Sequence, residues 1–145
     1  MITTTRATQS GSSPRTSAIG TTSAPTKTNS TPAVIPEMTL TFATSGGSVD
    51  LDFSCAFDVR DDDAGTIQFY LDTVAIPGTI RNIAFTGASG LLGLAPGSIG
   101  GLPVALSWRC DSLAAGSHTF DVRWTRSAGT LRAVTTQRMI TAVEL

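Results

Sequence analysis

Apolar and polar residues alternate along most of the chain after residue 37. In the clearest run, apolar residues take every second position from Leu51 to Val59, with Asp52, Ser54 and Asp58 between them. A period of two is typical of a β-strand with one face in a core and the other in solvent. Repeats of this pattern predict about eight strands, at residues 37–43, 48–59, 65–74, 79–85, 103–110, 117–126, 130–135 and 137–145.

Turn-forming residues separate these runs. They lie at Ser45–Gly47, Asp61–Gly65, Pro77–Gly78, Ala115–Gly116 and Ser127–Gly129. Many short strands joined by Gly-rich turns indicate a sandwich or a barrel. We therefore predict an all-β protein that folds as an antiparallel β-sandwich over residues 37–145. Eight strands favour a jelly roll, whereas seven would favour an immunoglobulin-like sandwich.

The first 36 residues lack this pattern. They contain 16 Ser or Thr and four Pro, with no aromatic residue and no helical or strand periodicity. Such a segment cannot bury enough apolar surface to offset the entropy of ordering. We expect residues 1–36 to form an extended arm that is ordered only by contacts outside the domain. An organelle transit peptide has a similar composition and is the alternative reading.

The low charge of the chain limits the kinds of partner that it is expected to bind. Charged residues are 14% of the 145-residue chain and the net charge is −1, so Ser, Thr and Gly must cover much of the surface. Such a surface suits packed assemblies and gives no field that would attract nucleic acid. The chain has no run of 18 apolar residues, so no transmembrane helix is expected. The arm has three basic residues and no acid, and the remainder has a net charge of −4.

The single histidine, His118, is the candidate for catalysis. A Ser-His-Asp arrangement would need His118 as the general base and a buried carboxylate to orient it. Asp121, three residues later, is expected on the solvent face together with Arg123, and the chain has no G-x-S-x-G motif. We interpret His118 as a residue that bonds the backbone of a turn, and we expect no catalytic residues and no enzymatic activity.

The acidic residues Asp58, Asp61, Asp62 and Asp63 form a possible cation site. Clustered carboxylates suit Ca²⁺, but the spacing lacks the regular positions and the closing Glu of an EF-hand loop. Asp in a turn, followed by Gly65, explains the same run. We favour the turn and expect no metal or other cofactor.

Two cysteines and two tryptophans stand in phase with core residues. Cys55 and Cys110 are more consistent with buried thiols than with a disulfide, although one bridge is possible. Trp108 and Trp124 are expected to pack in the core rather than to form a sugar-stacking platform.

A Gly-rich segment, residues 87–103, is expected to be a loop. It contains five large aliphatic residues, which need burial, and we expect it to lie near contacts between subunits. These residues are Leu91, Leu92, Leu94, Ile99 and Leu102.

Three short stretches resemble a known family. The stretch Ala115–Trp124, with the sequence AGSHTFDVRW, resembles a strand motif of tailed-phage virion proteins, and Gln137–Leu145 resembles their closing strand, which is led by Arg. Phe69–Asp72 approximates a hairpin of the same proteins, with Thr73 where Gly is commoner. The similarity covers residues 38–145, and the motif is shared by cement, head-fibre and tail-fibre proteins. It implies a trimeric β-sandwich on a phage particle and assigns no catalytic residues.

These observations predict a structural protein of the virion surface. The first hypothesis is a capsid cement or decoration protein, a homotrimer whose arm binds the major capsid protein by strand addition. The alternative is a receptor-binding head- or tail-fibre protein whose sandwich binds a host surface glycan. Neither nucleic acid nor a membrane is an expected partner.

Overall fold

The computed structural model of the protein describes residues 14–21, 24–60, 63–84, 98–134 and 138–145. All regular secondary structure of these residues is β-strand, and no helix among them is long and apolar enough to cross a membrane. The strands are β1 (Arg15–Ile19), β2 (Thr26–Lys27), β3 (Ala33–Thr44), β4 (Gly47–Arg60), β5 (Ala64–Leu71), β6 (Val74–Ala75), β7 (Arg81–Ala84), β8 (Ser98–Leu113), β9 (Gly116–Ala128), β10 (Leu131–Ala133) and β11 (Met139–Glu144).

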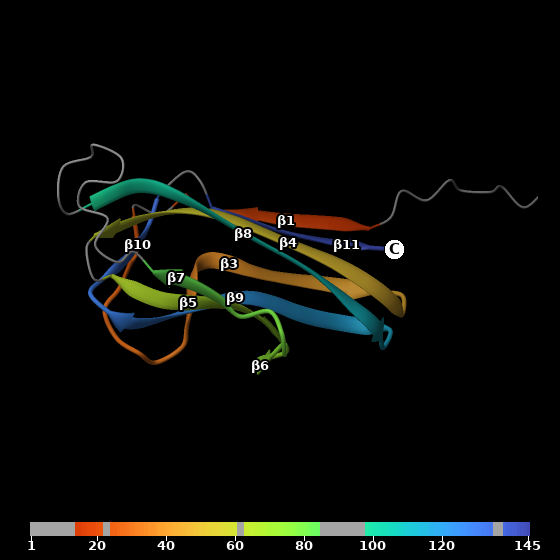
Figure 1. Ribbon diagram of the computed structural model, residues 1–145. Coiled ribbons are helices and arrows are strands. Elements are labelled where there is room, and N and C mark those ends of the chain that lie inside the picture. Colours follow the sequence, from red (N-terminus) through yellow and green to blue (C-terminus); the bar gives the residue numbers. More distant parts are fainter. Residues whose placement is uncertain (1–13, 22–23, 61–62, 85–97, 135–137) are drawn as a thin grey trace, which may run out of the picture.

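The described strands form two antiparallel sheets that pack as two layers (Figure 1). In the first sheet, one edge of the long strand β4 pairs with β11 and then with β10, and its other edge pairs with β8. β1 lies outside β11, and β2 lies outside β10. In the second sheet, β9 lies between β3 and β5, and the other edge of β5 pairs with β6 and β7. The prediction of an all-β protein with two antiparallel sheets is confirmed.

The core lies between the two layers. It is built from the alternate residues that face inward, as the period of two predicts. Leu51 and Phe53 of β4 face Phe69 of β5 and Phe120 and Val122 of β9, and all five are almost completely buried. Dense apolar packing between the two inner faces is the main favourable contribution to folding.

Each strand expected from the sequence has a counterpart in the structure. The largest difference is in β8, which begins at Ser98, whereas a loop was expected as far as Pro103. The expected strand 65–74 is divided into β5 and β6 by a tight turn at Asp72 and Thr73, which have φ angles of 47° and 74°. Positive φ at both central residues suits a two-residue hairpin turn.

The structure differs from the expected division of the chain at residue 36. β1 pairs with β11, β2 pairs with β10, and the beginning of β3 pairs with β9. The described residues 14–21 and 24–36 are therefore part of the two sheets rather than an arm outside them. Their polar composition fits edge strands that expose one face, for which hydrophobic periodicity is a weak signal. Residues 1–13 of the expected arm lie outside the described residues.

A buried arginine ties this N-terminal segment to the rest of the sandwich. Arg138, just before β11, is 1% exposed, and its Nη2 donates to Glu37 Oε2 at 3.0 Å. The backbone N–H and the hydroxyl of Thr21 donate to the same carboxylate at 2.6 and 2.8 Å. The carbonyl of Arg138 also accepts from the N–H of Gly20 at 3.0 Å. Three distant parts of the sequence therefore meet at one carboxylate and one guanidinium.

The backbone is shaped around this pair. A methyl group added at Gly20 would lie 2.6 Å from Nη2 of Arg138, so a larger residue there would force the guanidinium to move. Glu37 has a φ of 67°, and the register of β3 against β9 shifts between Val34 and Thr39. A non-glycine residue in this region of φ stores strain, which the surrounding contacts must compensate. The bulge in β3 is thus the feature that directs Glu37 toward Arg138.

Replacement of Arg138 should strongly destabilise the fold. Arg138→Ala leaves a cavity and removes the guanidinium from Glu37, so we expect the free energy of unfolding to fall by about 3 kcal/mol. The matched control is Arg132→Ala, because Arg132 is half-exposed and its Nε lies 3.9 Å from Asp58. That change should cost less than about 1 kcal/mol. Urea unfolding of both variants measures the difference, and equal losses would contradict the role given to Arg138.

Candidate functional site

The outer face of the first sheet carries regular cross-strand rows of side chains. In the first row, Arg15 of β1, Val143 of β11, Asp50 of β4 and Arg109 of β8 lie side by side. Directly opposite residues on one face of antiparallel strands are close enough for their side chains to interact.

The next two rows have different chemistry. One contains Ser17, Thr141, Asp52 and Ser107, and the other contains Ile19, Met139, Ser54 and Ala105. The outer face of this sheet therefore changes from charged to polar to apolar along the strands.

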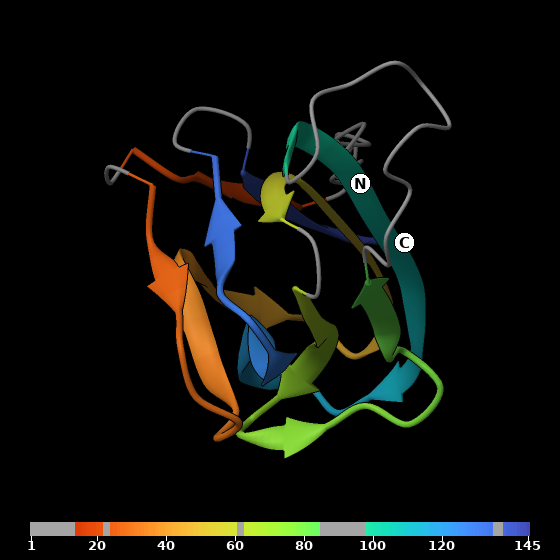
Figure 2. The same ribbon diagram turned by 60° about the vertical axis from the view of Figure 1, so that its left-hand side comes forward.

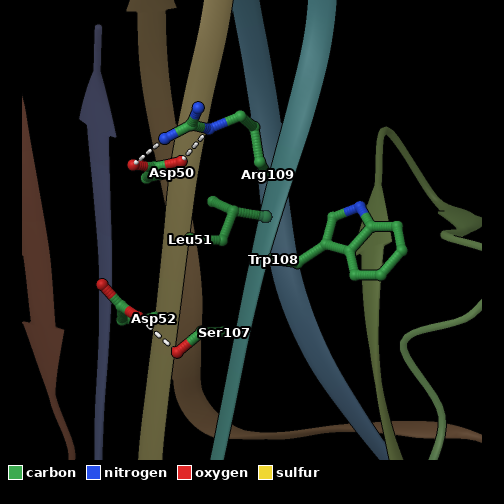
Figure 3. Close-up of a pocket in the computed structure, with 6 residues that line it drawn as sticks. All are labelled: Asp50, Leu51, Asp52, Ser107, Trp108 and Arg109. Atoms are coloured by element: carbon green, nitrogen blue, oxygen red, sulfur yellow. Dashed lines mark hydrogen bonds and ion pairs between the residues drawn. The ribbon is translucent and has the colours of Figure 1, made fainter.

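A shallow hollow of about 310 Å³ lies over β4 and β8 on this face. Arg109 donates from Nε and Nη2 to the two oxygens of Asp50 at 2.7 and 3.1 Å, and the hydroxyl of Ser107 donates to Asp52 at 2.6 Å (Figure 3). The hydrogen bond from Arg109 lowers the pKa of the Asp50 carboxyl. The hollow therefore presents fixed carboxylates, a guanidinium and a hydroxyl to solvent.

The chemistry of this hollow suits a polar ligand. On the neighbouring strand β11, the Thr141 hydroxyl, opposite Asp52, is buried and has no hydrogen-bond partner among the described residues. The indole of Trp108 points away from the hollow and toward the second sheet (Figure 3). The site can exchange hydrogen bonds with a polyhydroxylated molecule, but Trp108 offers it no aromatic platform. We did not predict this site, because its members are widely separated in sequence and meet only through strand register.

His118 lies at one end of the sandwich and joins two turns. Its Nδ1 lies 2.7 Å from Asp72 Oδ2, in the turn between β5 and β6, and its Nε2 lies 3.0 Å from the carbonyl oxygen of Ala114, between β8 and β9. The other oxygen of Asp72 accepts from the N–H of Thr119 at 2.8 Å. His118 bonds the backbone of a turn, as we interpreted it, and the stretches Ala115–Trp124 and Phe69–Asp72 meet at this pair.

Asp121 is on the outer face of the second sheet, as expected, but it is nearly buried. Arg123 donates to its two oxygens at 2.9 and 3.2 Å, and the guanidinium carbon of Arg123 lies 4.2 Å from the ring centroid of Tyr70. The carboxylate next to His118 is therefore that of Asp72, and Asp121 belongs to a separate cluster.

The described members of the acidic run accept hydrogen bonds from the protein. Asp63 accepts from the N–H groups of Arg60 and Thr130, both at 2.6 Å, and so holds two turns together. Asp58 accepts from the N–H of Gly101 at 3.0 Å. Asp61 and Asp62 lie outside the described residues. Within the described ranges, no group of three or more His, Cys, Asp or Glu residues could hold a metal ion.

Cys55 and Cys110 are both buried free thiols. Cys55 is opposite Val104 in the pairing of β4 with β8, and Cys110 is opposite Val49. The two cysteines are thus about six positions apart along the strands, or roughly 20 Å. A disulfide requires Cα atoms closer than about 7 Å, so this chain cannot join them in its folded state.

The two tryptophans differ in burial. Trp124 packs in the core, as expected, and its ring lies 6.2 Å from that of Phe57. The expectation for Trp108 is wrong, because its exposed fraction is 36%. Trp108 is in phase with the core residues Leu106 and Cys110, but β8 is the last strand of its sheet. An inward-facing residue on an edge strand is only partly covered by the opposite sheet.

The segment expected as a loop at residues 87–103 is only partly described. Ile99 pairs with Val59 in the sheet, and Leu102 pairs with Phe57 and packs against the core of its own chain. Leu91, Leu92 and Leu94 lie outside the described residues. Burial of Leu102 therefore needs no second subunit.

Two comparisons of the sequence with known proteins found no match. No family model matches the sequence, and no curated protein matches it. The function must therefore be argued from the geometry.

The pairing of His118 with Asp72 should make stability depend on pH. Both ring nitrogens face acceptors, so the protonated ring satisfies both, and the bond to Asp72 raises the pKa of His118 while that of Asp72 is lowered. The His118–Asp72 pair contributes fully to the free energy of unfolding when the imidazole is protonated and the carboxyl is ionised. That condition holds above the ordinary carboxyl pKa and below the ordinary imidazole pKa, from about pH 4 to about pH 6.5. It is lost as pH rises through the elevated pKa of His118.

Because Asp72 is half-exposed, we expect this contribution to be about 0.5 kcal/mol. Urea unfolding at pH 5.5 and at pH 8.5 measures it, with His118→Ala as the control that should lose the pH difference. An NMR titration that gives His118 a pKa at or below the ordinary value would refute the pairing.

The two cysteines should be unreactive in the folded protein. Burial raises the pKa of Cys55 to about 12 and that of Cys110 to about 11, so neither forms the reactive thiolate at neutral pH. A thiol-reactive dye should label neither residue in buffer and both in denaturant, without added reductant. If the unfolded protein is labelled only after a reductant is added, then Cys55 and Cys110 form a disulfide, and the strand register described here is wrong.

Proposed function

We propose that this protein is a bacteriophage virion structural protein, a capsid cement or decoration protein built on a jelly roll. The observation that carries the proposal is the nesting of its strand pairs. In chain order the main described strands are β1, β3, β4, β5, β7, β8, β9 and β11. The first pairs with the last, the second with the seventh, the third with the sixth and the fourth with the fifth.

Nested pairs of this kind support the jelly roll over the immunoglobulin-like sandwich. When a long antiparallel ribbon is rolled up, its successive strand pairs fall alternately in two sheets. Here the pairs β1–β11 and β4–β8 lie in one sheet, and the pairs β3–β9 and β5–β7 lie in the other. Jelly rolls of two Greek keys are common in viral capsid and lectin domains. Since one fold serves many functions, surface features must supply the rest of the argument.

The surface features favour a structural role. The chain has few charges for its size, and Ile19, Val74 and Ile80 expose 60%, 69% and 51% of their surface. Large exposed aliphatic residues on a charge-poor surface suit a protein whose surface is covered in an assembly. The proposed assembly is a homotrimer that lies over the junctions between capsid subunits and bridges them against internal pressure.

The proposed anchor to the major capsid protein is narrower than the sequence alone suggested. Residues from Arg15 onward belong to the sandwich, so the proposed anchor is reduced to residues 1–13. This segment contains Arg6 and no acidic residue. A trimer presents three copies of it, so weak single contacts can give tight overall binding.

The alternative is a receptor-binding head- or tail-fibre protein. The hollow over β4 and β8 favours it, because Asp50, Asp52, Ser107 and Arg109 offer both donors and acceptors to a glycan. If this protein is located on the surface of the capsid shell, the cement function is supported. If it is located at the tip of a fibre, the receptor-binding alternative is supported. Cryo-electron microscopy of the particles encoded by the same genome distinguishes these positions, and a protein absent from the particles would refute both.

Two truncations should behave differently. Removal of residues 1–13 should leave the fold intact and abolish binding to particles that lack the protein, because every described strand remains. Removal of residues 1–36 should unfold or strongly destabilise the chain, because it deletes β1, β2 and the beginning of β3. Circular dichroism measures folding, and co-sedimentation with depleted particles measures binding. If the shorter truncation still binds particles, residues 1–13 are not the anchor.

A further inference from the structure

Charged residues are almost absent from one long part of the chain. Arg81 is the only charged residue between Asp72 and Arg109. The described residues of this part form β6, the turn that follows it, β7, and β8 as far as Trp108. We call these residues, Thr73–Ala84 and Ser98–Trp108, the uncharged side.

The uncharged side occupies one lateral side of the sandwich. β8 is the outermost described strand of the first sheet, and β6 and β7 are the outermost strands of the second. Figure 2 shows β7 (green) and β8 (teal) along the same side, with β2 and β3 (orange) on the opposite one. Trp108 spans the two sheets here, since a methyl group added at Gly78 would lie 3.3 Å from its Cη2.

This side also exposes apolar side chains. Val74 and Ile80 are two of the most exposed aliphatic residues among the described ones, at 69% and 51%, and Trp108 is 36% exposed. Depletion of charge together with an exposed aromatic residue is the composition found at the centres of protein interfaces. Scattered exposed aliphatic residues alone would carry no such meaning.

Both sheets also end here in open edges. Among the described residues, β8 pairs only with β4, and β6 and β7 pair only with β5. The unpaired N–H and C=O groups of an edge strand attract another strand, and proteins usually prevent this with charged residues. β8 has none before Arg109. Pro103 lacks an N–H, so pairing with another strand is expected from Val104 onward.

We propose that the uncharged side binds a second copy of this chain. A surface with many charges of one sign repels its own copy, whereas this one has a single charge, Arg81, and meets little like-charge repulsion from a second copy. The open edge of β8 can also pair with the open edge of β7 in the next copy, and such a contact between different strands can repeat around a threefold axis. The inference rests on the self-association in the proposed function, and identifies the surface that makes it.

The experiment measures the mass of the full-length chain by light scattering after gel filtration. The unmodified protein should be an oligomer at micromolar concentration, with a trimer expected. Ile80→Glu and Val74→Lys place charges on the uncharged side, and each should raise the dissociation constant about tenfold or more. The control is Ile19→Glu, because Ile19 is 60% exposed on β1, away from this side. It should leave the oligomer intact, and circular dichroism verifies that all variants fold.

A monomeric unmodified protein would overturn the inference, as would an oligomer that dissociates only with Ile19→Glu. If the variants fail to fold, acrylamide quenching of the unmodified protein decides, because Trp124 is buried and Trp108 is the accessible indole. Quenching that increases on dilution supports the inference, and quenching that is independent of concentration overturns it. An oligomer that is absent from particles would refute only the virion location.

Discussion

The burial of the Arg138 guanidinium constrains the path of the chain at the end of β1 and at the bulge of β3. A charge removed from water is tolerated only when it is paired and hydrogen-bonded, and Arg138 meets that condition by contacting Glu37 and the carbonyl of Val134. Glu37 can reach Arg138 only because β3 bulges at this point. The backbone N–H and the hydroxyl of Thr21 donate two further hydrogen bonds to the Glu37 carboxylate. This cluster therefore fixes the register between the edge strand β1 and the rest of both sheets. Without it, a polar segment would have little apolar surface with which to remain folded.

The two lateral sides of the sandwich consequently differ. On the side of β1 and β3, Arg138 and Glu37 close the gap between the sheets with charged groups. On the side of β7 and β8, the partly exposed indole of Trp108 lies against the turn after β6, and the strand edges carry one charge, Arg81. A β-sandwich with one closed side and one apolar open side is suited to assembly in a fixed direction. Association through the open side would leave the outer face of the first sheet, with its polar hollow, available for other partners.

Local patterns in the sequence predicted most of the fold. Strands with strong alternation, such as the run from Leu51 to Val59, and turns marked by Gly or Asp lie close to their expected positions. The segment at residues 15–36 was not predicted, because β1 and β2 are short polar edge strands. The end of β1 is held next to Arg138, more than a hundred positions away, through the bond from the N–H of Gly20. Similarly, the exposure of Trp108 depends on β8 being outermost, and the pair of His118 with Asp72 depends on two turns meeting. Periodicity describes the faces of a strand, but tertiary structure decides its neighbours.

Hydrogen–deuterium exchange of the full-length chain at two protein concentrations tests the contrast between the two sides most directly. Exchange reports whether backbone N–H groups are protected by partners. On dilution, the account predicts faster exchange in β8 from Val104 to Trp108 and in the residues around Ile80, with β1 and β3 unchanged. Faster exchange in β1 and β3, with β8 unaffected, would show that the chain associates through the side that Arg138 closes and would contradict the account.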